Sequence, residues 1–464
     1  MRTRAAIITA KFLVLLLRKF GRGGTSLPGK AALWIQPDLL QILTLPLRII
    51  LVTGTNGKTT TARIISEILD RAGISHISNR SGSNLLNGIA AMLVEKCSLK
   101  GSFSADTALL ELDEAAFRLA CTRMRPHAVV VTNFFRDQLD RYGELYSTLN
   151  AVREGLAHTG PDTALILNAD DSLCTSLAKD SKGPVFFYGV EASAVSGDPA
   201  KTDLDALHCI YCGSRYAYAH RTYGHLGGFC CPGCGYSRPG LQVACTRILR
   251  EDTGGMSVDV NLRLPGQEEQ TIRMDIALPG LYNLYNALAA AGCGFALNLP
   301  VQAVTAAVAR FQSGFGRMET LNCGDRQIKL ILVKNPAGFN QVLAHLAPVK
   351  AGLHAAFLLN DNIADGTDVS WIWDVDFESF SDAPGIPARI SVCGRRKWDM
   401  ALRLKYSGFD EGDIHVEPSY SQLIQNALGA MAPGECLTLL PTYTAMLTIR
   451  RELSKHFSLP EFWA

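Results

Sequence analysis

Short apolar runs alternate with amphipathic stretches along most of the chain. Residues 47–52 form an apolar run that predicts a buried strand, and residues 60–73 follow with helical periodicity and a terminal glycine. Further short apolar runs, which predict more strands, occupy residues 108–112, 128–132 and 164–167. An alternation of strands and helices of this kind predicts a doubly wound α/β sheet.

The pattern changes after residue 200. A segment of about residues 202–240, rich in Cys, Gly and Tyr, interrupts the alternation. Residues 243–274 then alternate like antiparallel strands, and residues 279–297 form an Ala-rich helical stretch. After Gly316 the α/β rhythm restarts, with strands expected at residues 329–333, 355–359 and 388–392. The predicted domains are an N-terminal helical segment (1–45), a central domain with the Cys-rich insertion (46–316) and a C-terminal Rossmann-like α/β domain (317–464).

The N-terminus mixes apolar and basic residues. Residues 5–17 are apolar except for Thr9 and Lys11, and a basic stretch follows in place of a small-residue cleavage site. The run is too short and too interrupted to span a bilayer. Two interpretations stay open, an amphipathic helix packed on the next domain and a peripheral contact with a membrane surface. A cytoplasmic protein that works near the inner face of the membrane fits both.

Composition narrows the class of protein. With 464 residues the chain is too long for a single core, and 47% hydrophobic and 19% charged residues are typical of globular domains. A net charge of +2 argues against an extended nucleic-acid surface. The chain has 13 cysteines, and four that stand alone in apolar stretches are expected to be reduced and buried: Cys121, Cys174, Cys245 and Cys293.

Residues 54–60, Gly-Thr-Asn-Gly-Lys-Thr-Thr, lie between the first predicted strand and the first helix. Glycines let the backbone curl so that its N–H groups face phosphate oxygens, while Lys58 supplies positive charge and Thr59 a hydroxyl for Mg²⁺. Val52 stands where the strict Walker pattern has glycine. A plain strand–helix turn is the alternative. The position favours nucleotide binding by Gly54, Thr55, Asn56, Gly57, Lys58, Thr59 and Thr60.

Polar side chains also follow the next two predicted strands. Glu111 ends one strand, and Thr132 and Asn133 follow another. Carboxyl ends of parallel strands form the edge where such sheets bind ligands, and carboxylates there hold Mg²⁺. Acidic residues that only cap helix N-termini are the alternative. The phosphate loop in the same sheet favours the Mg²⁺ interpretation.

Four cysteines form two C-x₂-C pairs separated by eighteen residues: Cys209, Cys212, Cys231 and Cys234. Each pair presents two thiolates to one tetrahedral ion, which predicts a structural Zn²⁺ site. Four thiolates close the coordination, so the role expected is in folding. Four unrelated buried thiols and a redox pair are the alternatives, and Cys230 is a weaker ligand candidate.

The chain resembles the Mur ligase family. The resemblance rests on residues 54–60, Glu111, Thr132, Asn133, Leu139, Asp140, residues 168–171, residues 278–280, Asn283, Asn286, Ala287 and residues 316–319. It implies binding of ATP and of Mg²⁺, the latter by Thr59 and Glu111, and adenine or ribose contacts from Asn283, Asn286 and Arg317. Gln138 stands where the family typically has a His that helps to hold a second Mg²⁺. The family's carbamylated lysine has no assignable counterpart, with Lys179, Lys182 and Lys201 as candidates by location only.

Within this family the chain is similar to MurT-type ligases, which carry a zinc ribbon and lack the N-terminal domain that grips a UDP sugar. Residues 360–374 match their acidic C-terminal motif, and one of its aspartates is expected to complete the triad of a partner glutaminase. Asp361 is the first candidate because it lies nearest the strand end, and Asp365 and Asp368 follow. A network of turns with buried Trp residues is the alternative.

The resemblance implies an ATP-dependent carbon–nitrogen ligase that amidates the D-glutamate α-carboxyl of a lipid-linked peptidoglycan precursor, lipid II, through an acyl phosphate. The sequence contains no G-x-C-x-G nucleophile elbow. Ammonia is therefore expected from a class I glutamine amidotransferase of the GatD type. A folate- or amino-acid-adding Mur-type ligase is the alternative enzyme, and a zinc-ribbon ATPase acting as a scaffold is the alternative of another class.

Overall fold

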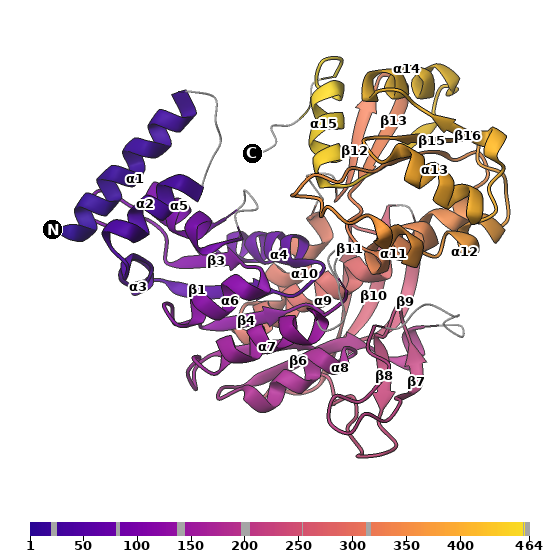
Figure 1. Cartoon of the computed structure of the whole chain (residues 1–464). Coiled ribbons are helices and arrows are strands. Elements are labelled where there is room, and N and C mark those ends of the chain that lie inside the picture. Colours follow the sequence, from indigo (N-terminus) through magenta and orange to yellow (C-terminus); the bar gives the residue numbers. More distant parts are fainter. Residues whose placement is uncertain are drawn as a thin grey trace. The chain divides into compact units, whose positions relative to one another are not determined.

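The computed structural model describes residues 1–19, 26–79, 84–136, 144–195, 205–252, 254–311, 317–457 and 459 (Figure 1). The chain divides into two compact units. The first unit comprises residues 1–135 and 145–311, and the second comprises residues 136–144 and 312–464.

The first unit contains a nine-stranded sheet in the order β11-β10-β9-β6-β5-β4-β1-β3-β2. From β9 through β6, β5, β4, β1 and β3 to β2, neighbouring strands of this sheet pair in parallel, and β10 pairs antiparallel with β9 and β11. The sheet is therefore mixed. The strands are β1 (Arg48–Thr53), β2 (His76–Ser78), β3 (Thr107–Glu111), β4 (Ala128–Val131), β5 (Ala164–Asn168), β6 (Val185–Val190), β9 (Val243–Asp252), β10 (Gly255–Leu262) and β11 (Gln270–Ile276).

Helices cover both faces of this sheet. On one face, buried side chains of α5, α6 and α7 share a core with Ile49 and Leu51 of β1. Side chains alternate along a strand, so Ile50 and Val52 point to the other face, where α4, α9 and α10 contact one another. The helices are α4 (Lys58–Arg71), α5 (Leu86–Lys96), α6 (Glu114–Cys121), α7 (Glu144–Leu156), α8 (Ser172–Ser176), α9 (Leu281–Ala296) and α10 (Val301–Arg310).

Three helices precede the sheet: α1 (Arg2–Lys19), α2 (Ser26–Ile35) and α3 (Leu39–Thr44). Helix α1 packs on α2 and α5 through Ala6, Ile7 and Ala10, which are fully buried (Figure 1). The packed-helix interpretation of the N-terminus is therefore confirmed. Among the described residues, none of the helices is both long enough and apolar enough to cross a membrane.

The Cys-rich segment forms a small element of its own between β6 and β9. Its strands β7 (Ala217–Arg221) and β8 (Gly227–Cys230) pair as a separate antiparallel sheet. Its core is small and is built from Cys209, Tyr216, Phe229 and Cys231.

The second unit has a six-stranded sheet in the order β12-β13-β17-β14-β15-β16, in which only β12 runs antiparallel to its neighbour. Its strands are β12 (Arg317–Cys323), β13 (Arg326–Ile331), β14 (His354–Leu358), β15 (Arg389–Cys393), β16 (Ile414–Val416) and β17 (Cys436–Pro441). Its helices are α11 (Pro336–Leu346), α12 (Phe377–Asp382), α13 (Lys397–Tyr406), α14 (Tyr420–Ala430) and α15 (Tyr443–Leu453). Each strand predicted from the sequence coincides with an observed strand to within a few residues, but the sequence analysis did not predict β2, β6, β7, β8, β12, β16 or β17.

Candidate functional site

The loop between β1 and α4 is shaped by two glycines with positive φ, +117° at Gly54 and +83° at Gly57. A side chain at either position would be strained by the positive φ and would also clash with neighbouring atoms. A Cβ on Gly54 would lie 2.4 Å from Thr132 Oγ1, and one on Gly57 would lie 2.0 Å from Asn286 Oδ1. The loop ends at the N-terminus of α4, where first-turn N–H groups have no intrahelical partner. Such a cradle fits a phosphate group.

The loop is held from the end of β4. Asn133 accepts a hydrogen bond from Thr55 N at its carbonyl oxygen (2.8 Å) and from Asn56 N at Oδ1 (2.9 Å). Thr132 Oγ1 donates to the carbonyl oxygen of Asn56 at 2.7 Å. All of these side chains lie in neighbouring parallel strands or in the turns that follow them. The strand-end residues predicted for Mg²⁺ binding therefore also determine the loop's conformation.

Lys58 lies over the loop that precedes it. Its Nζ donates to the carbonyl oxygens of Gly54 and Thr55, and it stands 3.7 Å from Glu114 Oε1 at the start of α6. The Lys58 side chain is mostly buried, with 11% of its surface exposed. A cation that is held at the loop centre, with its own charge only partly neutralised, suits an anionic ligand in the cradle.

Thr59 and Glu111 meet at the carboxyl ends of β1 and β3. Thr59 Oγ1 donates to Glu111 Oε1 at 2.8 Å, and Asn84 Nδ2 donates to the same oxygen at 2.9 Å. Asn79 holds the Glu111 backbone through two further hydrogen bonds. A hydroxyl and a carboxylate beside a phosphate cradle are the hard oxygen ligands that Mg²⁺ prefers, so this pair fits the ion.

The residues predicted to contact the adenine or ribose come from other elements than Thr59 and Glu111. Asn286 of α9 accepts a hydrogen bond from Thr61 Oγ1 at 3.4 Å, which places its side chain against the phosphate loop. Asn283, also buried, donates to the carbonyl oxygen of Pro279 at 2.7 Å. Arg317 begins β12 in the other unit. The side chain of Arg317, like residues Gln138, Asp140 and Lys201, lies outside the described part of the chain.

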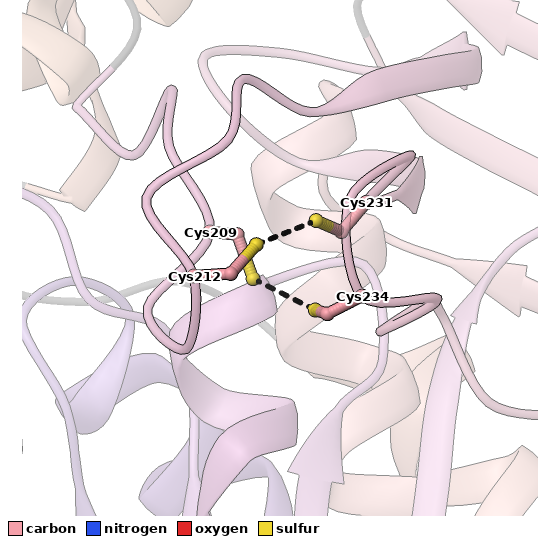
Figure 2. A group of neighbouring side chains, drawn as sticks. All are labelled: Cys209, Cys212, Cys231 and Cys234. Carbon is pink, nitrogen blue, oxygen red and sulfur yellow. Dashed lines mark hydrogen bonds between the residues drawn. The ribbon is translucent and has the colours of Figure 1, made fainter.

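The four cysteines of the insertion converge on one point (Figure 2). Their Sγ atoms all lie within 4.8 Å of one another, with Cys209–Cys234 at 3.6 Å and Cys212–Cys231 at 3.3 Å. Sulfurs around tetrahedral Zn²⁺ lie about 3.8 Å apart. The thiol set therefore fits Zn²⁺.

Two other cysteine predictions also have an outcome. The neighbouring Cys230 is exposed and is not one of the four converging thiols. The four cysteines expected to be buried and free are so: Cys121, Cys174, Cys245 and Cys293.

A buried polar network joins the Cys-rich insertion to the sheet edge. Asp170 accepts from Arg238 Nε at 2.5 Å and from the Tyr285 hydroxyl at 2.6 Å. Asp171 lies 3.4 Å from His225 Nε2 and accepts from Phe134 N at 2.7 Å. These acidic residues, which the sequence showed only as part of a family pattern, anchor the insertion beside the loop after β4.

The buried pair of Asp171 and His225 has opposed pKa shifts. Burial alone would raise the pKa of the Asp171 carboxyl, but the charge of His225 and several hydrogen bonds lower it. Burial alone would lower the pKa of His225, but Asp171 raises it. The His225 ring also contacts Phe135, 4.7 Å between centroids, and Phe135 N donates to Thr55 Oγ1 at 3.2 Å. The insertion thus reaches the phosphate loop through one intervening residue.

The three candidate aspartates of the second unit have different environments. Asp365 is buried and accepts from Thr444 N at 2.7 Å, from the Thr444 hydroxyl and from Asn362 N, so it caps the start of α15. Asp361 is partly exposed and pairs with Arg395 Nε at 2.8 Å and with Arg396 at 3.4 Å. Asp368 is exposed and accepts from Ser370 N at 2.8 Å.

Sequence reasoning missed several of these partners. Asn84 and Glu114 contact Glu111 and Lys58 respectively, and His225 pairs with Asp171. Glu114 belongs to the acidic run of residues 111–114 at the strand end, but nothing in that run indicates Lys58 as its partner. Asn84 stands in a segment with no motif, and His225 lies within the Cys-rich insertion but outside its C-x₂-C pairs, so no pattern in the sequence indicates their partners. Of the lysines named by location, Lys179 lies over the Tyr211 ring and Lys182 donates to the Ala157 carbonyl.

Two family models match the chain. The Mur ligase middle domain matches residues 52–216, and the MurT ligase C-terminal domain matches residues 332–446. The chain is 34% identical over 457 residues to the lipid II isoglutaminyl synthase (glutamine-hydrolyzing) subunit MurT of Streptococcus pneumoniae, covering 98% of this chain and 97% of that relative. The corresponding subunit of Staphylococcus aureus (strain COL) is 31% identical, with 98% and 99% covered.

Amino-acid-adding ligases match less of the chain. The UDP-N-acetylmuramoylalanine–D-glutamate ligase of Pelotomaculum thermopropionicum is 27% identical over 272 residues, or 58% of this chain and 46% of that relative.

Solved structures of low identity share the fold. MurF from Acinetobacter baumannii aligns with a TM-score of 0.66 at 17% identity, covering 94% of this chain and 81% of that one. Folylpolyglutamate synthase from Mycobacterium tuberculosis, complexed with ADP, aligns with a TM-score of 0.63 at 14% identity, covering 96% and 98%. The prediction of a Mur-ligase-type α/β fold is thereby confirmed, with mixed sheets in both units.

Proposed function

The chain belongs to the MurT family of Mur ligases, and from this premise we propose that it is the synthetase subunit of a lipid II isoglutaminyl synthase. It amidates the α-carboxyl of D-glutamate in the peptidoglycan stem peptide and consumes ATP. The observation that carries this proposal is sequence similarity over 98% of the chain to subunits of that name, whereas the amino-acid-adding ligase of Pelotomaculum thermopropionicum matches 58% of the chain in sequence.

The reaction follows from acyl-phosphate chemistry. A carboxylate oxygen of the substrate attacks the γ-phosphorus of ATP, the bond to the β–γ bridging oxygen breaks, and ADP leaves. Ammonia then attacks the acyl carbon, loses a proton, and expels phosphate as the C–O bond breaks. Lys58 and the backbone N–H groups of the loop stabilise the oxygens that gain negative charge in the first step.

Thr59 and Glu111 would hold Mg²⁺, which would supply positive charge to neutralise the phosphate oxygens. Asn84 fixes the carboxylate of Glu111 from the side, which keeps one of its oxygens at the Thr59 hydroxyl. Asn283, Asn286 and Arg317 are proposed nucleotide contacts. The proposed domain division is an N-terminal helical segment (1–45), the ATP-binding domain (46–316) and the C-terminal domain (317–464). The proposed location of the protein is the cytoplasm.

A direct assay tests the activity. The purified protein, supplied with lipid II, ATP, Mg²⁺ and ammonium, is expected to release ADP and phosphate in proportion to amidated product, identified by mass spectrometry. A mixture in which free amino acids or folate replace ammonium and lipid II is the matched control. ADP release that requires an amino acid acceptor, without amidation of lipid II, would assign the chain to the amino-acid-adding ligases instead.

The ammonia is proposed to come from a class I glutamine amidotransferase of the GatD type bound to this chain. A partner's Cys–His pair needs a third group to orient the imidazole. Asp361 is the first choice because its carboxylate is partly exposed and held by two arginines. Asp368 is second, and Asp365 is last because its oxygens are occupied within the unit.

This assignment is tested in the complex with two amide donors. Asp361→Asn should lower glutamine-dependent synthesis strongly and leave ammonium-dependent synthesis near the wild-type rate. Asp368→Asn is the matched variant in the same loop. If Asp368→Asn shows that selective loss and Asp361→Asn does not, the role moves to Asp368. Equal loss with both donors would remove either residue from the glutaminase step.

The cysteine quartet is proposed to hold a structural Zn²⁺ in a ribbon inserted into the central domain. The chain offers a matched pair of variants. Cys231→Ser removes one of the converging thiols, and Cys230→Ser removes its exposed neighbour. Metal analysis of the purified proteins should find about one Zn²⁺ per chain in wild type and Cys230→Ser, and a loss of metal and of solubility in Cys231→Ser. A zinc-replete, folded Cys231→Ser would contradict the site.

A further inference from the structure

The first 37 residues have an unusual charge. They contain seven basic residues and no acidic residue, and the first carboxylate side chain of the chain is Asp38. The remaining residues contain 38 basic and 43 acidic side chains, so they are net negative. The positive charge of the N-terminal helices is therefore a local feature that the near-neutral total conceals. Such a local excess attracts anionic surfaces.

Helix α1 exposes an apolar face. Ile8, Phe12, Leu15 and Leu16 are spaced i, i+4, i+7 and i+8 along one side of the helix, and their exposed fractions are 53%, 60%, 65% and 41%. The side turned inward, with Ala6, Ile7 and Ala10, packs on α2 and α5. The exposed face is thus not the one that stabilises the fold.

Helix α2 repeats the arrangement. Leu27, Lys30 and Trp34 are spaced i, i+3 and i+7, all are exposed, and Trp34 reaches 85%. Arg2 and Arg4 at the start of α1 are exposed as well. Large apolar side chains interleaved with cations are typical of helices that lie in the headgroup region of a bilayer, where Trp is especially favoured.

We propose that α1 and α2 form a docking surface for an anionic lipid bilayer. The exposed apolar side chains enter the headgroup region, and the basic side chains bind lipid phosphates. Charge decides between this occupant and a second copy of the chain, because two copies would bring fourteen cations together with no acidic side chain of the same segments to neutralise them. The inference stands on the N-terminal helices alone and does not depend on the proposed reaction.

Vesicle flotation tests the proposal without any activity measurement. Wild-type protein is mixed with vesicles of phosphatidylcholine alone or with phosphatidylglycerol added, and bound protein is collected by density. Binding is expected on the anionic vesicles, with strong weakening on pure phosphatidylcholine and at high salt. Binding to neither vesicle, or equal binding to both, would overturn the proposal.

Variants locate the surface. The triple variant Phe12→Ser/Leu15→Ser/Trp34→Ser should bind anionic vesicles at least about tenfold more weakly, because it removes apolar area that enters the bilayer. Ile386→Ser, which changes an 81% exposed side chain in the other unit, is the control and should bind like wild type. Circular dichroism checks that each variant is folded. Undiminished vesicle binding by the triple variant would contradict the surface assignment.

Two further readouts separate the alternatives. The emission of Trp34, obtained as the difference between wild type and Trp34→Phe, should shift to the blue when anionic vesicles are added, because the indole leaves water. Light scattering without lipid should give the same mass for wild type and the triple variant. A dimer that the triple variant loses would show that a second copy occupies this face, and the proposal would be wrong.

Discussion

The phosphate loop at residues 54–60 and the acidic loop at residues 360–374 both follow a buried parallel strand, yet their side chains act in different ways. In the phosphate loop the main chain forms the cradle, and Gly54 and Gly57 have backbone angles that favour glycine. In the acidic loop the roles depend on partners far along the chain. Asp365 binds Thr444, and Asp361 binds Arg395 and Arg396.

A short motif specifies function to different degrees in the two loops. Where the backbone binds the ligand, residue type at each position almost determines function, because only glycine permits the required φ and the close approach. Where side chains make the contacts, residues of the same type can have different roles. Of three aspartates within eight positions, one caps a helix, one pairs with arginines and one closes a turn. Variants that break each loop should show this contrast.

The largest effect is expected from Lys58→Ala. It removes the charge nearest the cradle, and loss of one such group at the transferring phosphate costs about 10²- to 10³-fold in turnover. Among the described residues, the Lys58 side chain contacts two carbonyl oxygens and forms one ion pair, so stability should change little. ADP release with lipid II and ammonium is the measurement, and Lys405→Ala, an exposed lysine, is the control. Normal turnover by Lys58→Ala would remove the loop from the reaction.

A smaller effect is expected from Gly57→Ala. The new Cβ would lie 2.0 Å from Asn286 Oδ1 at a positive φ, so the loop or α9 must shift, and nucleotide affinity should fall by about tenfold or more. Gly73→Ala is a matched control, because Gly73 also has a positive φ but no atom within 4 Å of the added Cβ. Calorimetric titration with ADP and Mg²⁺ distinguishes them. Equal losses in both variants would assign the effect to backbone strain alone.

In the acidic loop the corresponding effect is on stability. Asp365→Ala leaves the N–H of Thr444 and that of Asn362 without their carboxylate, which should lower the free energy of unfolding by about 2–3 kcal/mol. Asp368→Ala, seven residues after Asp361 and exposed, should change it by less than about 0.5 kcal/mol. Urea unfolding measures both. Similar stabilities would show that Asp365 is not a structural cap.

The sequence predicts the fold well, since every strand expected from an apolar run is present and the helix after the phosphate loop begins at Lys58. The motif also predicts the loop, the Thr59–Glu111 pair and the convergence of four cysteines. It does not separate Asp361 from Asp365, nor does it reveal that His225 reaches Asp171 across 54 positions. Those contacts depend on how distant segments pack, and no local periodicity encodes them.

The last prediction concerns the support of the phosphate loop, which is itself a distant contact. Asp171 pairs with His225 and accepts a hydrogen bond from Phe134 N. The next residue, Phe135, donates a hydrogen bond from its N to Thr55 Oγ1 in the phosphate loop. The conformation of the phosphate loop is therefore determined by its local sequence. The residues that support the loop, like those that bind the aspartates of the acidic loop, are distant in the sequence. His225→Gln tests how much of the stability of the first unit depends on the charge of this pair.

The sign of the pH effect follows from the two shifts. His225 has a raised pKa, so its contribution is complete below the ordinary value of 6.5 and is lost as pH rises through the folded-state pKa. Asp171 has a lowered pKa, so its contribution is complete above 3.8 and is lost as pH falls through the folded-state pKa. The unfolding free energy that His225→Gln loses should therefore be greatest between pH 3.8 and 6.5. It should shrink toward pH 9, as His225 loses its proton in the folded protein. His415→Gln, at an exposed site, is the control. A loss that stays constant from pH 5 to 9 would mean that folding leaves the pKa of His225 unchanged, and a loss that grows toward pH 9 would mean that His225 is neutral when buried.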